Sequence, residues 1–159
     1  MNTAIKKYPL LFSYRDLIAG RGFVAGVSIV GRVLLEVNDG ECWMYGVQPG
    51  GFAGGGADKN TAFCEFKNSY LSVLYDLAIE ARTFDAFKSQ VESFFAQINL
   101  LNAQEWDAAL AAVRQNGTSL EGLAKVNADS QQCGVQVVLL DMAQTTPQDN
   151  QFGVLHEAA

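Results

Sequence analysis

The sequence has few of the residues on which hydrolytic and metal-dependent sites depend. Its 159 residues include one histidine, His156, close to the end of the chain, so packing cannot hold a Ser-His-Asp triad around it. The three cysteines, Cys42, Cys64 and Cys133, are odd in number and widely spaced. They offer no pair at zinc-ligand spacing and indicate reduced thiols, not a disulfide framework. We therefore expect no catalytic triad, no metal site and no cofactor.

Long apolar runs are missing as well. No run approaches the ~20 residues that a bilayer-spanning helix needs, and the apolar run in the opening MNTAIKKYPLLF is too short for a signal peptide. The apolar fraction of 49% and the charged fraction of 18% are typical of a globular protein. We expect a cytoplasmic protein that does not associate with membranes, with one domain at 1–143 and a flexible tail at 144–159.

Basic residues become scarce after position 40. Residues 1–40 carry five basic and three acidic side chains, whereas the remainder carries six basic and fourteen acidic ones. Clustered Lys and Arg supply most of the affinity for a nucleic-acid backbone, so we do not expect nucleic acid as a partner. The net charge of −6 favours a basic protein partner instead.

The first third of the chain predicts an antiparallel meander. Aromatic and β-branched side chains dominate its apolar runs, as expected of strands. Asn38-Asp39-Gly40 separates two of these runs, and a glycine in the last position favours a hairpin in which Gly40 is left-handed. A later apolar run, GVQVVLLD, predicts a buried strand near the C-terminus. We expect strands at 8–18, 22–37, 41–47 and 134–141.

A glycine-rich segment, GVQPGGFAGGGADKN at 46–60, follows the third strand. It holds six glycines in fifteen residues but lacks the Gly-x-x-x-x-Gly-Lys-Ser/Thr and Gly-x-Gly-x-x-Gly patterns of nucleotide-binding loops. Asp58, near the following helix, would also repel an anion from the free amides there. We therefore interpret the segment as a connector that lets the chain reverse from an edge strand onto a helix. Whether a small ligand binds near Gly46–Asn60 stays open.

From about residue 61 the hydrophobic period changes from two to about 3.6, which predicts helices. Capping side chains suit three of the helix starts: Asp58 or Asn60, Thr83, and Asn102 paired with Glu105. We expect helices near 61–82, 84–98, 103–115 and 118–127. The predicted fold class is α+β: an antiparallel β-meander of three strands plus a C-terminal strand, with three to four helices packed on one face.

Residues 103–127 allow two interpretations. Two short helices around QNGT match the outline of a helix-turn-helix, with Gly117 as the turn glycine. The second of them, TSLEGLAKVN, offers one lysine and one glutamate and no set of side chains for reading bases. A helical hairpin packed on the sheet is favoured, and contact of 103–127 with DNA stays open.

Three carboxylates suggest an enzymatic alternative. The order strand-strand-strand-helix-strand places Asp16 on the first strand, Glu65 early in the helix and Asp141 at the end of the last strand. This arrangement resembles ribonuclease-H-like nucleases, in which such acids hold divalent metal for phosphodiester cleavage. The long insertion before the last strand and the lack of a basic groove argue against this function.

The third strand carries a candidate protein-binding site. In Cys42-Trp43-Met44-Tyr45 large side chains alternate between the two faces of the strand. If helices cover only one face of the sheet, the other face exposes aromatic surface, which is a usual mark of a partner site. Trp43 and Tyr45 are the residues that we expect to contact a partner.

Residues 22–82 resemble HicB-like antitoxins. The resemblance rests on strand, hairpin, strand and then a Pro49-Gly50 step and a glycine-rich turn with Gly56, Asp58 and Thr61 before the helix. It implies a degenerate ribonuclease-H-like fold without catalytic residues, homo-oligomers, and neutralisation of a small basic ribonuclease toxin. The chain departs from the family in its 83–131 helical region and has no clear DNA-binding segment, so operator binding is not carried over.

The leading hypothesis is therefore a non-catalytic, oligomeric protein-binding module of the HicB-like antitoxin type. Two alternatives stay open at this point. One is a ribonuclease-H-like, metal-dependent nuclease that uses Asp16, Glu65 and Asp141, and the other is an adaptor whose partner is unrelated to toxins.

Overall fold

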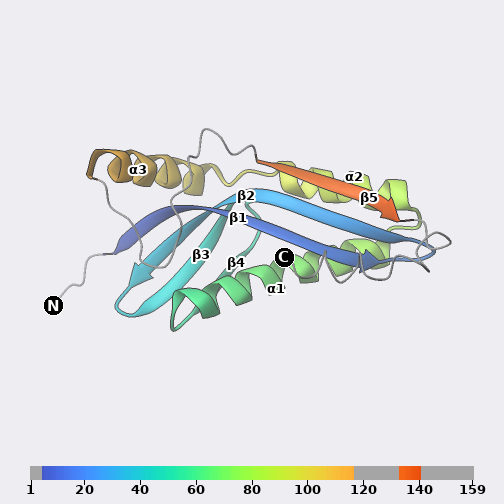
Figure 1. Cartoon of the computed structure of the whole chain (residues 1–159), viewed down its shortest axis with the longest axis horizontal. Helices are drawn as coiled ribbons and strands as arrows, with labels where there is room; N and C mark the ends of the chain where they lie inside the picture. The colour runs from blue at the N-terminus through green and yellow to red at the C-terminus, as the bar shows by residue number, and fades with distance from the viewer. Residues whose placement is uncertain (1–4, 117–132, 141–159) are drawn as a thin grey trace.

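The computed structural model describes residues 5–116 and 133–140, which form one sheet and three helices (Figure 1). The predicted helix at 118–127, the tail at 144–159 and Asp141 lie outside the described residues. The fold class is α+β, as the sequence predicts: an antiparallel meander, a C-terminal strand, and helices. In chain order the elements are β1 (Lys6–Ala19), β2 (Val24–Asn38), β3 (Glu41–Gln48), β4 (Ala53–Gly56), α1 (Lys59–Glu80), α2 (Phe84–Ala96), α3 (Leu100–Asn116) and β5 (Gly134–Leu140).

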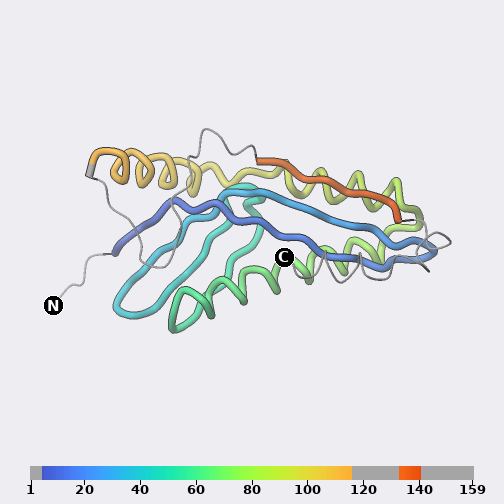
Figure 2. Tube along the Cα trace, viewed as in Figure 1, coloured from blue at the N-terminus to red at the C-terminus, as the bar shows by residue number. Residues whose placement is uncertain are grey.

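The long strand β2 is central in the sheet, whose order is β1-β2-β3-β4, and it pairs with β1, β3 and β5. One edge of β2 pairs with β1 along the whole of both strands. Its other edge is shared, because residues 24–30 pair with β5 and residues 32–38 pair with β3. All of these pairings are antiparallel. Figure 2 shows β5 beside β2, so residues more than 100 positions apart in the sequence lie in adjacent strands.

The β2–β3 hairpin turns on Asp39 and Gly40. Both have positive φ, 50° and 85°, and the flanking Asn38 and Glu41 are paired. Two left-handed residues between paired strands are the hallmark of the tight turn that matches strand twist, and Asp-Gly is a favoured sequence for it. The predicted left-handed Gly40 is confirmed, but the connection has two residues, not three.

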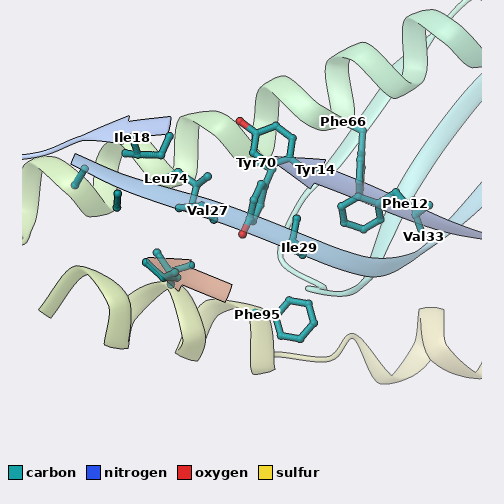
Figure 3. Packing of buried hydrophobic residues seen from close by; sticks show 14 of the residues in the cluster. Phe12, Tyr14, Ile18, Val27, Ile29, Val33, Phe66, Tyr70, Leu74 and Phe95 are labelled. Atoms are coloured by element: carbon teal, nitrogen blue, oxygen red, sulfur yellow. The ribbon is translucent and has the colours of Figure 1, made fainter. Parts of the chain in front are cut away.

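One face of the sheet holds the main core, which α1 and α2 cover. Figure 3 shows Phe66 and Tyr70 of α1 pointing toward the sheet, and Phe95 of α2 approaching it from the other side of the view. Phe66 packs edge-on against Phe12 with ring centroids 5.0 Å apart, and Tyr70 packs against Tyr14 at 5.3 Å. Two pairs of aromatic rings therefore join α1 to β1.

The third helix, α3, lies on the opposite face of the sheet, so the expectation that all helices share one face is wrong. Figure 1 shows α1 and α3 on opposite sides of β1–β3. Trp106 of α3 packs with Leu34 and Val47 in a second buried cluster, and its indole nitrogen donates to the Leu10 carbonyl at 3.1 Å. Leu34 alternates with Val33 and Leu35 of the main core, so β2 is apolar on both faces here. A second helix layer is needed to bury the other side.

The helix starts confirm two of the three predicted caps. The Asp58 carboxylate accepts from the Thr61 amide at 2.7 Å, and the Thr83 hydroxyl accepts from the Ala86 amide at 3.1 Å. The predicted box of Asn102 and Glu105 is wrong, because Asn99 is the residue whose side chain accepts from the first turn of α3, at 3.0 Å. The side chain of Asn102 donates instead to the Gly46 carbonyl at 3.1 Å, which ties α3 to β3.

Part of the glycine-rich segment is a strand that the sequence analysis missed. Residues 53–56 form β4, which pairs with β3 and lies against α1. A Cβ placed on Gly54 would lie 2.2 Å from the Phe66 backbone nitrogen, and the Ser69 hydroxyl donates to the Ala53 carbonyl at 3.0 Å. The glycines therefore let α1 pack directly on the backbone of the edge strand.

Candidate functional site

Trp43 and Tyr45 form an aromatic pair on strand β3. They lie two residues apart on β3, on the face opposite the α1–α2 core, since the intervening Met44 is buried in that core. Their rings are stacked, with centroids 6.2 Å apart and planes 15° apart. Trp43 keeps 43% of its surface exposed, and Tyr45 is half-buried. Both predicted partner-contact residues thus lie together on the face of β3 that α3 packs on further along the strand, at Val47.

A glycine supports the aromatic pair from the neighbouring strand. Trp43 is opposite Gly55 in the β3–β4 ladder, and a Cβ on Gly55 would lie 2.6 Å from the indole ring. The indole therefore packs flat on the backbone of β4, a position that any side chain at 55 would block. A large ring held between a glycine backbone and a second aromatic ring loses little rotamer freedom when a partner binds.

Acidic side chains surround the aromatic pair. Glu36 is directly opposite Trp43 in the β2–β3 ladder, and Glu41 precedes Trp43 by two residues and so shares its face. Among the described residues, Lys7 lies opposite Glu36 in the β1–β2 ladder, and it is bound to Glu105 of α3 with 2.8 Å between Nζ and Oε1. Burial, together with the negative charge of Glu36, raises the pKa of Tyr45. The local field is negative, and it would attract a cation.

The carboxylates proposed for a nuclease do not form a common site within the described part of the chain. Both oxygens of Asp16 are used locally, one by the Tyr14 hydroxyl at 3.1 Å and the other by the Leu17 amide at 2.8 Å. Glu65 is exposed on α1, five residues before Tyr70, whose ring packs against Tyr14. Five residues correspond to about 7.5 Å of helix rise. No group of three His, Cys, Asp or Glu that could hold a metal ion occurs among residues 5–116 and 133–140.

The glycine-rich segment is packed by the chain's own atoms. Added Cβ atoms at Gly46, Gly50 and Gly56 would lie within 3.0 Å of Pro49, Asn99 and Thr61 respectively. The segment serves as the connector that the sequence predicts, and its close contacts are internal ones.

The first helix of the possible helix-turn-helix is a sheet-packed helix. Trp106 of α3 is only 5% exposed, and the Arg32 guanidinium lies over its ring, 5.4 Å from the centroid. The described half of 103–127 therefore fits a helix packed on the sheet, and residues 117–127 lie outside the described residues.

No protein-family model matches the chain, and neither a curated protein nor a solved structure matches it. The resemblance to HicB-like antitoxins therefore stays a prediction from the residues at 22–82. Within the described residues, no helix combines the length and the apolar content that a membrane crossing requires.

Sequence reasoning located the aromatic pair but missed the residues that complete it. Glu36 and Gly55 come beside Trp43 only through strand pairing, and Gly55 sits in a segment without side-chain periodicity. A signal for Glu36 was present: in an Asp-Gly hairpin the pairing counts outward from the turn, which places Glu36 opposite Trp43.

Proposed function

We propose that the chain is a non-catalytic protein-binding module that receives a basic partner on Trp43 and Tyr45. The observation that carries the proposal is an exposed tryptophan held flat on Gly55, with the carboxylates of Glu36 and Glu41 beside it. Large, pre-positioned aromatic rings are the side chains that contribute most at protein interfaces.

The surroundings of the aromatic pair specify the kind of partner. A Lys or Arg side chain over an aromatic face gains a cation–π attraction, and a carboxylate beside the ring adds an ion pair. Glu36 and Glu41 are placed to supply that second contact, whereas Lys7 is already bound by Glu105. Charge complementarity with a net charge of −6 would also speed the encounter.

The more specific form of the proposal follows the HicB-like resemblance of residues 22–82. In that form the partner is a small basic toxin, the chain is a homo-oligomer, and the two proteins meet in the cytoplasm. The acidic chain and the aromatic pair support this form, and they equally suit an adaptor for another basic protein.

A titration with a deca-arginine peptide tests basic-partner binding directly. The chain has two tryptophans, so the Trp106→Phe variant leaves Trp43 as the only indole reporter. We expect saturable change of Trp43 emission, with an affinity that falls steeply as salt rises because the contacts are ionic.

The matched variants are Glu36→Gln, next to Trp43, and Glu92→Gln, an exposed glutamate on α2. Both remove one negative charge, so they separate a local contact from the net charge. Weaker binding in Glu36→Gln alone supports the proposal. Equal weakening in both variants, or no saturation in the Trp106→Phe protein, would show that the aromatic pair does not receive basic groups.

A further inference from the structure

The face of the sheet on which α3 packs has a second half, which none of the described helices covers. Near the hairpin end, α3 packs on Leu34 and Val47, but the other half of this face is formed by β1, the first part of β2 and β5. A hollow of about 370 Å³ lies there, and side chains from all three strands line it. On this face the lining residues are Ser13, Arg15, Ser28, Val30, Gly134 and Gln136.

The strand register brings the polar groups of the hollow into one row. Ser28 is opposite Arg15 on β1 and opposite Gln136 on β5, so three polar side chains cross the sheet side by side. Directly opposite side chains in antiparallel strands have Cβ atoms about 4.5–5.5 Å apart. A hydroxyl, a guanidinium and an amide therefore lie within reach of one small molecule.

Arg15 is a free cation at this hollow. Its side chain is exposed, and it makes no hydrogen bond or ion pair in the described part of the chain. The cations that the described parts of β1 and β2 carry elsewhere on this face have partners: Lys7 binds Glu105, and Arg32 lies over the Trp106 ring and donates to Gln48 at 3.3 Å. No carboxylate is among the described residues that line the hollow, so Arg15 gives this lining a net positive charge.

Gly134 lines the hollow without a side chain, and no described residue packs against the position that a side chain would take. A Cβ added there would meet no atom of the described residues within 4 Å, and its φ is not in the left-handed region. The contrast is with Gly54 and Gly55, where a Cβ would collide with the chain itself. The lack of a side chain at Gly134, the first residue of β5, leaves its backbone open to a molecule in the hollow.

We propose that this hollow binds a small molecule with an anionic group, a carboxylate or a phosphate. Arg15 holds the charged group through paired N–H donors, the Ser28 hydroxyl and the Gln136 amide donate beside it, and the body of the ligand lies on the backbone at Gly134. Ser28 and Glu36 are eight residues apart on β2, or about 26 Å at strand rise, so this site is separate from the aromatic pair. It is also independent of the proposed function.

Amide chemical shifts of the full chain, recorded while inorganic phosphate or citrate is added at constant ionic strength, test the proposal. We expect saturable shifts of Ser13, Arg15, Ser28 and Gln136. Saturation by phosphate alone indicates a phosphate ligand, and saturation by citrate alone indicates a carboxylate. Failure of both anions to give saturable shifts at these residues overturns the proposal.

Two variants define the site. Arg15→Gln should weaken binding about tenfold or more, because it removes a charge-assisted contact, while Arg82→Gln, an exposed arginine after α1 with the same charge change, should match the wild type. Gly134→Val should abolish the shifts without lowering the thermal unfolding midpoint, because its side chain fills only the hollow. Binding that survives Arg15→Gln, or falls equally in Arg82→Gln, would contradict the assignment.

Discussion

The two faces of the sheet are built differently. The face under α1 and α2 is a continuous aromatic core in which Phe66, Tyr70 and Phe87 are fully buried. The opposite face is divided among the small cluster under Trp106, the aromatic pair at Trp43 and Tyr45, and the polar hollow at Arg15. The difference suggests a division of roles, in which the first face supplies stability and the second presents groups to other molecules. The predictions below test that division.

The largest loss of stability should come from a substitution in the core under α1 and α2. Phe66→Ala removes a ring that contacts both Phe12 and Phe52, and it should lower the free energy of unfolding by about 3–5 kcal/mol. Phe63→Ala, three residues earlier on the same helix and only partly buried, should cost clearly less. Urea denaturation measures both, and equal midpoints for the two variants would show that the face of α1 is misassigned.

Gly54→Ala should have the second-largest effect. It should lower the free energy of unfolding by about 1–3 kcal/mol, because the added methyl would meet the α1 backbone at Phe66. The left-handed conformation is not involved, since the φ of Gly54 is not positive in the left-handed range. Gly26→Ala, on the bare half of the second face, is the matched control, because its Cβ meets no described atom within 4 Å. If Gly26→Ala lowers the free energy of unfolding as much as Gly54→Ala does, the two faces do not differ in how much they contribute to stability.

Trp106→Phe tests how much the second cluster contributes. The variant keeps most of the apolar contact but removes the indole N–H that donates to the Leu10 carbonyl. We expect a loss of about 1 kcal/mol in the free energy of unfolding, typical of one hydrogen bond. Thermal denaturation by circular dichroism suffices, and a loss as large as that of Phe66→Ala would mean that both faces stabilise the fold equally.

Tyr70→Phe should change the stability least of these variants. The Tyr70 hydroxyl is buried and has no hydrogen-bond partner in the part of the chain that the structure describes, and burial raises its pKa. Removing an unsatisfied polar group should leave the stability unchanged or raise it by about 1 kcal/mol. Tyr14→Phe is the control, because the Tyr14 hydroxyl donates to Asp16 and its loss should cost stability. A Tyr70→Phe protein that unfolds at lower urea than Tyr14→Phe would indicate a hidden partner for the hydroxyl.

Local signals in the sequence predicted the elements that local physics determines. Alternation and β-branched residues located β1, β2, β3 and β5. Short-range caps identified Thr83 at the start of α2 and offered Asp58 or Asn60 for α1, of which Asp58 is the cap. The end of α2 was predicted wrongly, since the helix expected at 84–98 ends at Ala96, and Ile98 beyond it is exposed.

The features that were missed depend on contacts between distant residues. The strand β4 has no side-chain pattern, and it exists because Phe66 and Ser69 of α1 pack on its glycines. Helical periodicity marks which side of α3 is buried, but it does not say which face of a sheet receives Trp106. The candidate site shows the same limit: Trp43 and Tyr45 follow from alternation, whereas the positions of Glu36 and Gly55 come from strand pairing.

The most direct test of the central claim is the affinity of the Trp43→Ala variant for deca-arginine, measured by calorimetry on protein whose urea unfolding curve is recorded in parallel. The division between the faces predicts an affinity about tenfold or more below that of the wild type, because an interfacial tryptophan is lost. It also predicts an unfolding midpoint close to that of the wild type. Unchanged affinity, or a loss of stability comparable to that of Phe66→Ala, would contradict it.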